Sequence, residues 1–505
     1  MPVNDSQGTR ESGRRVSRRV FVKTTGAAGV GASLAGCLTG GGGGDGDDGG
    51  GGGRTDTQIN TEAPEEDITI QWAADDNFAD AQSEIQSSLE DAGLPDNIQL
   101  EIISGSFTTG DRRNQYNNIL NAGQSEPTIL MVDNGWAIPF MVRGQLLNLS
   151  DALPSEMVET VRNDYFQASV STATYNGDLY AVPLFADFPT MQYRKDLVED
   201  AGYDPEGENW AEESMSWQRF SEITADVAAQ NGMDGFTFQG SAYEGLSCCA
   251  FNEFMTSMGG AYFGAHENLF GPIGDRPITV EEQPVVDAIR LMRTFVHGES
   301  DPHALEGITG DISPEAVIQY TEEPSREPFT NGEVVMHRNW PYSIVINGGE
   351  ENFGEDLGVM PIPYGTTPEE AQYEGTGGPA AALGGWHLAI NPNASDAKKQ
   401  AAVQVLRAIM NEQSQLDRFE IGGWAPPVPE LIDSEAARDL DVIGRYTTQL
   451  RIAGENAVPR PVTQVWNQES QQIYSEVNGS LQQNKAPDQA MSDLASALEQ
   501  IENSV

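Results

Sequence analysis

Residues 67 to 136 alternate between strand-like and helix-like segments. The strand-like segments alternate apolar and polar residues or are continuously apolar, and the helix-like segments have a period of three to four residues. This alternation builds a parallel sheet with helices packed on its faces, so it constrains the fold more than any other feature of the chain. We expect a strand at 68–73, a helix at 81–92, a strand at 98–103, a helix at 112–122 and a strand at 128–132.

Polar side chains follow the first and third of these strands. Asp75, Asp76 and Asn77 come after the first strand, and Asp133 comes directly after the third. In open α/β sheets, ligands bind outside the carboxyl ends of the strands. We therefore expect these side chains to lie at a ligand site.

The stretch from Tyr175 to Lys195 reads YNGDLYAVPLFADFPTMQYRK. A turn at Asn176–Gly177 precedes an apolar strand, in which Pro183 cannot donate to a sheet ladder and so indicates an edge or crossover strand. We interpret this strand as passing between two lobes and delivering Phe185 and Asp187 to the cleft between them. The alternative is an ordinary buried strand with one solvated aspartate.

The length and the net charge of the chain limit the number of lobes and the classes of partner. A chain of 505 residues exceeds what a single core normally holds, so we expect at least two lobes. The net charge of −49 repels nucleic acid and anionic membranes, which excludes both as partners. Salt screens such self-repulsion, so the charge is typical of an exported halophilic protein. A cation store, the alternative, would need clustered ligand motifs, which the sequence lacks.

The first 37 residues have the pattern of an export signal. The segment SRRVFVK at 17–23 resembles the twin-arginine signal, and LAGC at 34–37 resembles the lipobox of exported lipoproteins, in which Cys37 becomes the lipid-bearing N-terminus. A glycine- and aspartate-rich tether follows at 38–66, and no later apolar run is long enough to span a membrane. We expect a protein that is anchored at the extracellular face of the membrane.

The sequence shows no catalytic or metal-binding signature. It contains no GxSxG, HExxH or P-loop motif, and its five histidines have no ligand spacing, so we expect neither an enzyme nor a metal or cofactor. Cys248 and Cys249 are adjacent and can bridge only in a strained ring, so two small buried thiols are the favoured interpretation.

Aromatic residues recur at predicted loops and strand ends. Tryptophan and tyrosine rings pack against the C–H faces of sugars, while carboxylates, amides and arginines bind sugar hydroxyls. One such tryptophan alone is more often core packing than a ligand contact. Several at strand ends favour a sugar site; the residues are Trp72, Trp136, Trp340, Tyr342, Trp386 and Trp424.

Seven sequence blocks carry a family resemblance. In chain order they read PTILMVDNGW, NGDLYAVPLFADFPTMQYRKDL, GFTFQGSAYEGL, FTNGEVVMHRNWPY, GGWHLAI, WAPPVPEL and RPVTQVW. Together they resemble the extracellular solute-binding proteins of family 1, the trehalose/maltose-type receptors of ABC importers, over residues 67–505. The resemblance implies the type II-like periplasmic-binding-protein fold, with two α/β lobes, hinge crossovers and a ligand cleft between the lobes.

The resemblance also implies how the chain is divided and what it does. One lobe would comprise 67–184 and 343–390, and the other 185–342 and 391–505. The protein would be a monomer that captures a di- or oligosaccharide such as trehalose or maltose and delivers it to a membrane permease with a separate ATPase. The alternatives are a secreted glycoside hydrolase, with Asp133 and Asp187 as its acid–base pair, and a structural surface protein.

By motif, the ligand contacts of this family fall on ten positions. Asp76 stands within Asp75–Asp76–Asn77, where family members often have a glutamate. Trp340 and Tyr342 flank Pro341, and in an extended segment both rings would face the same side as one aromatic platform. The ten predicted contacts are Asp76, Arg112, Asp133, Phe185, Asp187, Trp340, Tyr342, Gly385, Trp386 and Arg460.

Overall fold

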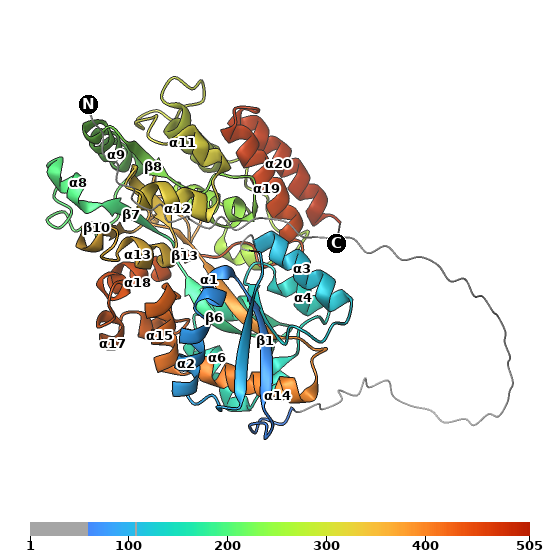
Figure 1. Ribbon diagram of the computed structural model, residues 1–505. Coiled ribbons are helices and arrows are strands. Elements are labelled where there is room, and N and C mark those ends of the chain that lie inside the picture. The colour runs from blue at the N-terminus through green and yellow to red at the C-terminus, as the bar shows by residue number, and fades with distance from the viewer. Residues whose placement is uncertain (1–58, 107–108, 505) are drawn as a thin grey trace, which may run out of the picture. The chain divides into compact units, whose positions relative to one another are not determined.

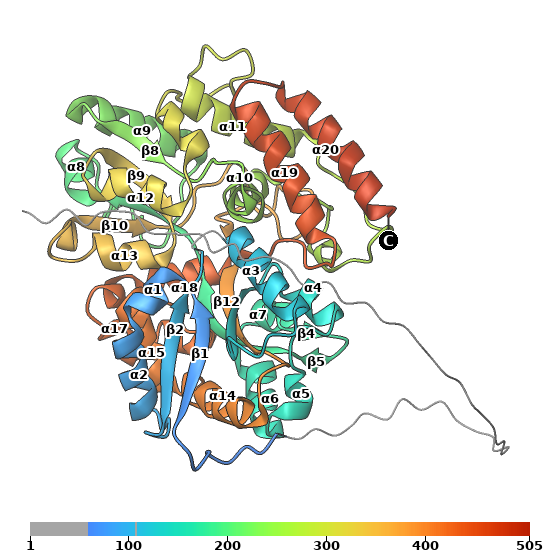
Figure 2. The same ribbon diagram turned by 45° about the vertical axis from the view of Figure 1, so that its right-hand side comes forward.

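The computed structural model describes residues 59–106 and 109–504, which all lie in one unit, Asp56–Val505. The predicted signal at 1–37, including Arg18, Arg19 and Cys37, lies outside the described residues, as does most of the predicted tether. Two β-sheets with separate hydrophobic cores organise the described part of the chain. Figures 1 and 2 show the strands β1 and β2 in the lower half of this unit, and the helices α9, α11, α19 and α20 in the upper half.

The first sheet contains the strands predicted between residues 67 and 136. The strands β1 and β2 are parallel, with Trp72 beside Ile102, and β1 also pairs in parallel with β3. The added strand β12 lies between β3 and β6 and runs antiparallel to both, so the sheet is mixed. Its order is β2 (Ile98–Ser104), β1 (Ile68–Ala74), β3 (Ile129–Asp133), β12 (Gly384–Ile390) and β6 (Ala181–Asp187).

Helices with one buried face cover this sheet. In α2, Ile85 and Leu89 are four residues apart and buried in the same core as β1 and β3. The predicted helices at 81–92 and 112–122 correspond to α2 and α3 and are confirmed. The helices of this core are α1 (Asp76–Asp80), α2 (Gln82–Asp91), α3 (Thr109–Asn121), α4 (Ala137–Val142), α5 (Leu149–Ala152), α6 (Ser155–Asp164), α7 (Gln167–Thr172) and α14 (Asp396–Ile409).

The second sheet is shorter and also mixed. Its strand β9 pairs antiparallel with β7 and parallel with β8, and β10 pairs antiparallel with β7. The order is β10 (Leu357–Met360), β7 (Thr190–Arg194), β9 (Val334–Asn339) and β8 (Asp234–Thr237). Its core contains the helices α8 (Lys195–Asp200), α9 (Trp217–Asn231), α10 (Phe251–Ser257), α11 (Gln283–His297), α19 (Trp466–Leu481) and α20 (Pro487–Glu502), with the π-helix η1 (Leu246–Ala250) and the 3-10 helix η3 (Glu315–Gln319).

A third core cluster lies where the chain passes between the sheets. Ala186 at the end of β6 and Phe188 just after it are buried there with residues of β9 and β10. The helices of this cluster are α12 (Glu322–Thr330), α13 (Pro341–Asn347), α15 (Glu412–Gly422), α16 (Pro429–Ile432), α17 (Glu435–Arg438) and α18 (Thr447–Glu455), with the 3-10 helix η5 (Ile443–Tyr446). The 3-10 helices η2 (His266–Phe270) and η4 (Gly354–Asp356) complete the helical elements.

The stretch from Tyr175 to Lys195 joins the two sheets, as its sequence indicates. Asn176 and Gly177 have positive φ angles of 52° and 83° and close a hairpin between β4 (Thr174–Tyr175) and β5 (Asp178–Leu179). Pro183 lies in β6, an edge strand of the first sheet, as expected for a residue without an N–H donor. After Phe188 the chain enters β7 of the second sheet, so the crossover interpretation is confirmed.

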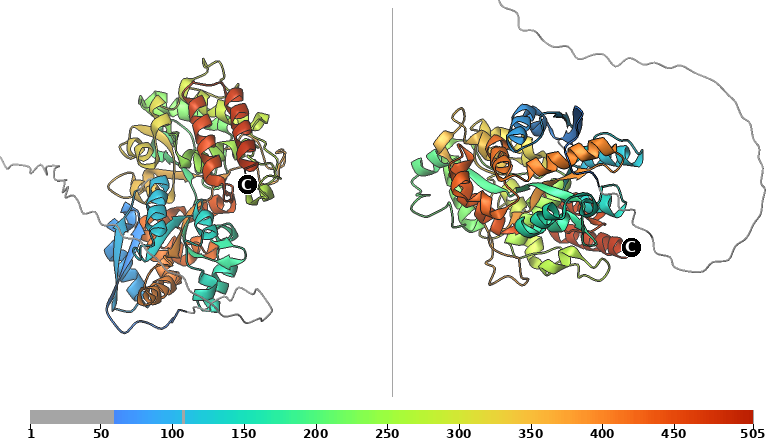
Figure 3. Two further views of the ribbon diagram at one scale, coloured as in Figure 1. Left: turned by 90° about the vertical axis from the view of Figure 1, so that its right-hand side faces the viewer. Right: turned by 90° about the horizontal axis from the view of Figure 1, so that it is seen from below.

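Two further passages join the sheets. In the first, the chain goes from β10 in the second sheet to β12 in the first sheet. In the second, it leaves the first core and passes through β13 (Ala457–Val458), which pairs with β11 (Ala381–Ala382), before it enters α19 in the second core. Figure 3 shows the blue N-terminal strands in one half and the red C-terminal helices in the other. Two segments differ from our lobe boundaries: β10, within 343–390, pairs in the second sheet, and α14, within 391–505, packs in the first core. The rest of the division stays a prediction.

Candidate functional site

A cavity lies where the carboxyl ends of β1, β3 and β6 meet residues of the second core. It has about 840 Å³ of space between its walls, part of it open to solvent. Its lining contains both aromatic rings and charged groups. The lining residues are Asp75, Asn77, Thr109, Arg112, Asp133, Phe185, Asp187, Tyr243, Gly245, Cys248, Cys249, Glu322, Trp340, Tyr342, Gly384, Gly385, Trp386, Gly423, Trp424 and Arg460.

The structure brings nine of the ten predicted contacts to this cavity; Asp76 is the exception. Asp76 is exposed on α1 and accepts a hydrogen bond from the hydroxyl of Ser104 on β2. The neighbouring Asp75 lines the cavity in its place, because it occupies the N-cap of α1, where its Oδ1 accepts a hydrogen bond from the amide of Phe78 at 3.1 Å.

Arg112 connects two walls of the cavity. Its Nη1 lies 3.6 Å from Oδ2 of Asp75, and its guanidinium carbon lies 4.0 Å from the centroid of the Trp386 ring. Arg112 is 1% exposed, and its Nε and Nη1 have no hydrogen-bond acceptor among the described residues. Burial raises the pKa of Asp75, and the Arg112 charge opposes that shift. This arginine therefore retains donor capacity at the cavity.

Asp133 and Arg460 form a second charged pair. The Nη1 of Arg460 lies 3.0 Å from Oδ1 of Asp133, which also accepts a hydrogen bond from the Gly135 amide at 2.7 Å. A Cβ at Gly135 would collide with the Arg460 guanidinium, so glycine permits this approach. Glu244 completes the cluster at 3.9 Å from Arg460, and burial and the Asp133 carboxylate raise the pKa of Glu244.

Trp340 is held in place by a buried ion pair behind it. The guanidinium of Arg338 lies 4.7 Å from the Trp340 ring centroid and bonds both carboxylate oxygens of Glu253, with Nε to Oε2 at 2.8 Å. Glu253 also accepts a hydrogen bond from the Ala382 amide at 3.0 Å. A Cβ at Gly384 would touch the indole, so glycine leaves room for the ring.

The predicted aromatic platform has a different geometry. Pro341 is the first residue of α13, so Trp340 is the N-cap and Tyr342 lies in the first helical turn. The expectation of an extended segment is therefore wrong, because a proline restricts its own φ to a value that also suits the start of a helix. Both rings still line the cavity. The Tyr342 hydroxyl donates to Oε1 of Glu323 at 2.6 Å.

Asp187 presents a carboxyl group that has no hydrogen-bond partner among the described residues. It ends β6 and lines the cavity with Phe185. Burial raises the pKa of Asp187 well above its usual value, the Arg338 charge opposes the shift, and the charges of Asp75 and Asp133 add to it. A raised pKa favours the protonated carboxyl group, which can donate a hydrogen bond as well as accept one.

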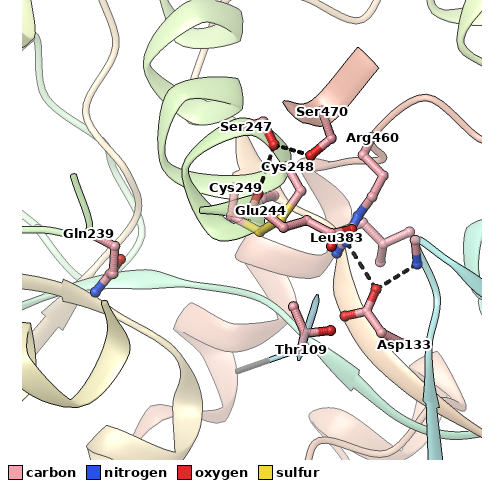
Figure 4. The surroundings of a disulfide bond; sticks show 12 residues. Thr109, Asp133, Gln239, Glu244, Ser247, Cys248, Cys249, Leu383, Arg460 and Ser470 are labelled. Atoms are coloured by element: carbon pink, nitrogen blue, oxygen red, sulfur yellow. Dashed lines mark hydrogen bonds and ion pairs between the residues drawn. A yellow bond between two sulfur atoms is a disulfide. The ribbon is translucent and has the colours of Figure 1, made fainter. Parts of the chain in front are cut away.

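Cys248 and Cys249 are joined by a disulfide, which Figure 4 shows. Both residues line the cavity. The interpretation as two buried thiols is therefore wrong about their chemical state. Both residues lie in the π-helix η1 and are 4% exposed, so the expected burial is confirmed. Adjacency in sequence does not fix the local helical geometry, and that geometry decides whether the sulfurs meet.

Comparison with known proteins identifies the family. Residues 64–441 match the family model described as bacterial extracellular solute-binding protein. The chain belongs to this family. A probable ABC transporter-binding protein of Deinococcus radiodurans is 29% identical over 392 residues, which cover 76% of this chain and 82% of the relative.

Solved structures of binding proteins share the fold. The maltose-bound MalE3 of T. maritima is 26% identical, with a TM-score of 0.71 over 85% of this chain and 98% of that one. The GacH receptor of Streptomyces glaucescens, solved without ligand and with acarbose, is 18% identical, with a TM-score of 0.66 over 86% and 98%. This solute-binding protein therefore has the two-lobed α/β fold, and its role is to bind a substrate for an ABC transporter.

Several lining residues of this solute-binding protein were not predicted. Glu322 and Thr109 lie in segments without strand-end or family signals, and the tertiary fold brings them to the cavity. Tyr243 lies in the family block GFTFQGSAYEGL, but it is not among the ten predicted contacts. Asp75 could have been found, because an aspartate three residues before a helical Phe78 has the pattern of an N-cap. Trp424 was noted among the aromatic residues but was not included in the predicted site.

The described residues contain no cluster of histidine, cysteine, aspartate and glutamate that could hold a metal ion. Within the same part of the chain, no helix combines the length and apolar character needed to cross a membrane.

Proposed function

We propose that this solute-binding protein captures a neutral di- or oligosaccharide, such as maltose or trehalose, and delivers it to a membrane permease with a separate ATPase. The observation that carries the proposal is one cavity lined by both ring faces and hydroxyl-binding groups. Phe185, Trp340 and Trp386 bring aromatic rings to the cavity, where they can pack against sugar C–H groups. Arg112 has unpaired N–H groups, and the Asp187 carboxyl group lines the same space. The maltose bound by the T. maritima relative supports this ligand class.

The charge of the cavity favours a neutral ligand over an anion. Four carboxyl groups line it, on Asp75, Asp133, Asp187 and Glu322, against the two arginines Arg112 and Arg460. Arg112 lies 3.6 Å from Asp75 and Arg460 lies 3.0 Å from Asp133, so an anionic ligand would have to compete with a carboxyl group for each arginine. A sugar hydroxyl both donates and accepts, so it can bond either type of group.

We propose binding without turnover. The Oδ1 of Asp133 accepts hydrogen bonds from the Arg460 guanidinium and the Gly135 amide, so this oxygen is engaged in orienting the wall. In a hydrolase the Asp133–Asp187 pair would instead act on a sugar bond or a water between them. Capture by lobe closure fits the contacts of Arg113, whose Nη1 lies 3.3 Å from Glu244 and 2.6 Å from Oδ1 of Asn467.

Thermal unfolding in molar salt with maltose, trehalose and lactose tests the proposal. A sugar at 100 times its Kd should add about 2.7 kcal/mol to the free energy of unfolding, or roughly 3 °C for a chain of this length. Asp187→Ala should weaken binding by about tenfold or more, because it removes a ligand-binding group without breaking a described hydrogen bond. The exposed Asp96→Ala should bind normally.

Calorimetry and chromatography complete the test. Absence of heat and of a melting shift with every sugar would refute the proposed ligand class. Release of monosaccharide by the wild type, lost in Asp187→Ala, would instead support the glycoside hydrolase.

We also propose export by the twin-arginine route and a lipid anchor at Cys37, from the motifs at 17–23 and 34–37. Cys37→Ser should release the protein into the medium, because a glycine-rich tether has no membrane affinity. Replacing Arg18 and Arg19 by lysine should block export. Membrane retention of the first variant would contradict the anchor, and normal export of the second would contradict the route.

A further inference from the structure

The disulfide between Cys248 and Cys249 lies in the wall of the cavity, on the π-helix η1. Gly245, directly before η1, lines the same space. π-helices are rare and occur frequently at functional sites. Figure 4 shows the bridged cysteines at the end of their helix, on the side that faces Thr109 and Asp133. The disulfide therefore lies where the second core borders the proposed sugar site.

Ser247 fixes this turn from behind. Its hydroxyl pairs with that of Ser470 on α19 at 2.6 Å and donates to the Glu244 carbonyl at 2.8 Å. The Tyr262 hydroxyl donates to the Ser247 carbonyl at 2.7 Å. These bonds join η1 to the second core, and the cysteines that follow Ser247 are presented to the cavity. Such anchoring gives the two sulfurs one fixed position.

The bridged and reduced states offer different surfaces to a ligand. A disulfide has no S–H donor and is apolar and polarizable, whereas two thiols are weak donors that rotate independently. The rest of the wall nearby is charged, with Asp133 and Arg460 in contact at 3.0 Å. The disulfide is thus a rigid apolar patch within a polar surface, and a preorganised patch binds at a smaller entropic cost.

We propose that the Cys248–Cys249 disulfide contacts the bound sugar and holds an apolar C–H face of its ring against the second lobe. The inference rests on the proposed saccharide function and deepens it by adding a specificity-determining contact. The aromatic rings of the cavity cover other C–H faces, so the disulfide favours sugars that present an unsubstituted face to this wall.

Isothermal calorimetry with maltose, trehalose and lactose tests the proposal on the oxidised wild type, on the double variant C248S/C249S, and on wild type reduced with tris(2-carboxyethyl)phosphine. Mass measurement after alkylation verifies the thiol state. The expected result is an affinity about threefold weaker in both modified proteins, with a changed ratio between sugars. Phosphine treatment of C248S/C249S is the control for Cys37 and for the reagent, and it should change nothing.

Each outcome decides one question. Affinities and sugar ratios within twofold of the oxidised wild type would overturn the disulfide contact and leave the saccharide function standing. Binding of none of the sugars by the oxidised wild type would overturn both. If C248S/C249S fails to fold, the reduced wild type, which keeps every residue, decides by the same criterion.

Discussion

Trp340 is a side chain whose replacement should affect stability more than sugar binding. It is 8% exposed, so of an indole surface of about 250 Å² only about 20 Å² faces the cavity. A sugar that covers this area buries a comparable area of its own, and about 40 Å² at 25 cal/mol per Å² gives about 1 kcal/mol. Trp340→Ala should therefore weaken binding about fivefold.

The same substitution removes a buried ring from the second core. Trp340 packs on Arg338 and on Gly384, and its loss leaves a cavity beside the Arg338–Glu253 ion pair. Large aromatic-to-alanine changes in cores cost about 3–5 kcal/mol of unfolding free energy. Urea denaturation should show a loss in this range, and Trp340→Phe should recover part of both effects.

Calorimetry beside the denaturation curve separates the two contributions. A hundredfold loss of affinity in Trp340→Ala, with an unchanged unfolding midpoint, would refute this reasoning. It would mean that the indole is held mainly by the ligand and not by the protein around it.

Three further predictions concern charge. Because burial raises the pKa of Asp187, the stability that depends on its proton is complete at acid pH and is lost as pH rises toward the folded-state pKa. Asp187→Asn should therefore melt above wild type at pH 7 and match it near pH 3, whereas an equal gap at both values would contradict the shift. Arg338→Ala should cost about 3–5 kcal/mol of unfolding free energy in urea denaturation, because it leaves Glu253 buried without its partner. Arg219→Ala breaks an exposed ion pair and should cost less than 1 kcal/mol. Similar losses in the two variants would refute the distinction between buried and exposed pairs. With a net charge of −49, the melting temperature should fall from molar to millimolar salt, and a flat response would exclude charge repulsion as a determinant of stability.

Local patterns were sufficient to predict much of the first sheet. The strands β1, β2 and β3 and the helices α2 and α3 follow from apolar periodicity within short windows. Asp133 lies at the cavity as predicted, because the carboxyl ends of parallel strands share one edge of a sheet, and Asp187 lies there because a crossover strand delivers it. The position of β12 between β3 and β6 depends on pairing across about 200 residues, which no local pattern encodes.

The site differs from the prediction at positions where the local backbone conformation determines which side chain reaches the cavity. Asp75 lines the cavity and Asp76 does not, because the N-cap position turns one side chain inward and leaves the next exposed. Pro341 suits both an extended segment and a helix start, and only packing selects the helix. The disulfide between Cys248 and Cys249 depends on the π-helical turn, which has no recognised sequence signature here.

The insertion of β12 has a consequence for synthesis. When the ribosome has made residues up to Leu383, β3 and β6 both exist, but the strand that joins them does not. Each then presents an unpaired edge, and exposed edges recruit strands from other chains. The first sheet can close only after about three quarters of the polypeptide has emerged. Stalled or truncated chains that end before Gly384 should therefore be more prone to aggregation than chains that end after Ile390.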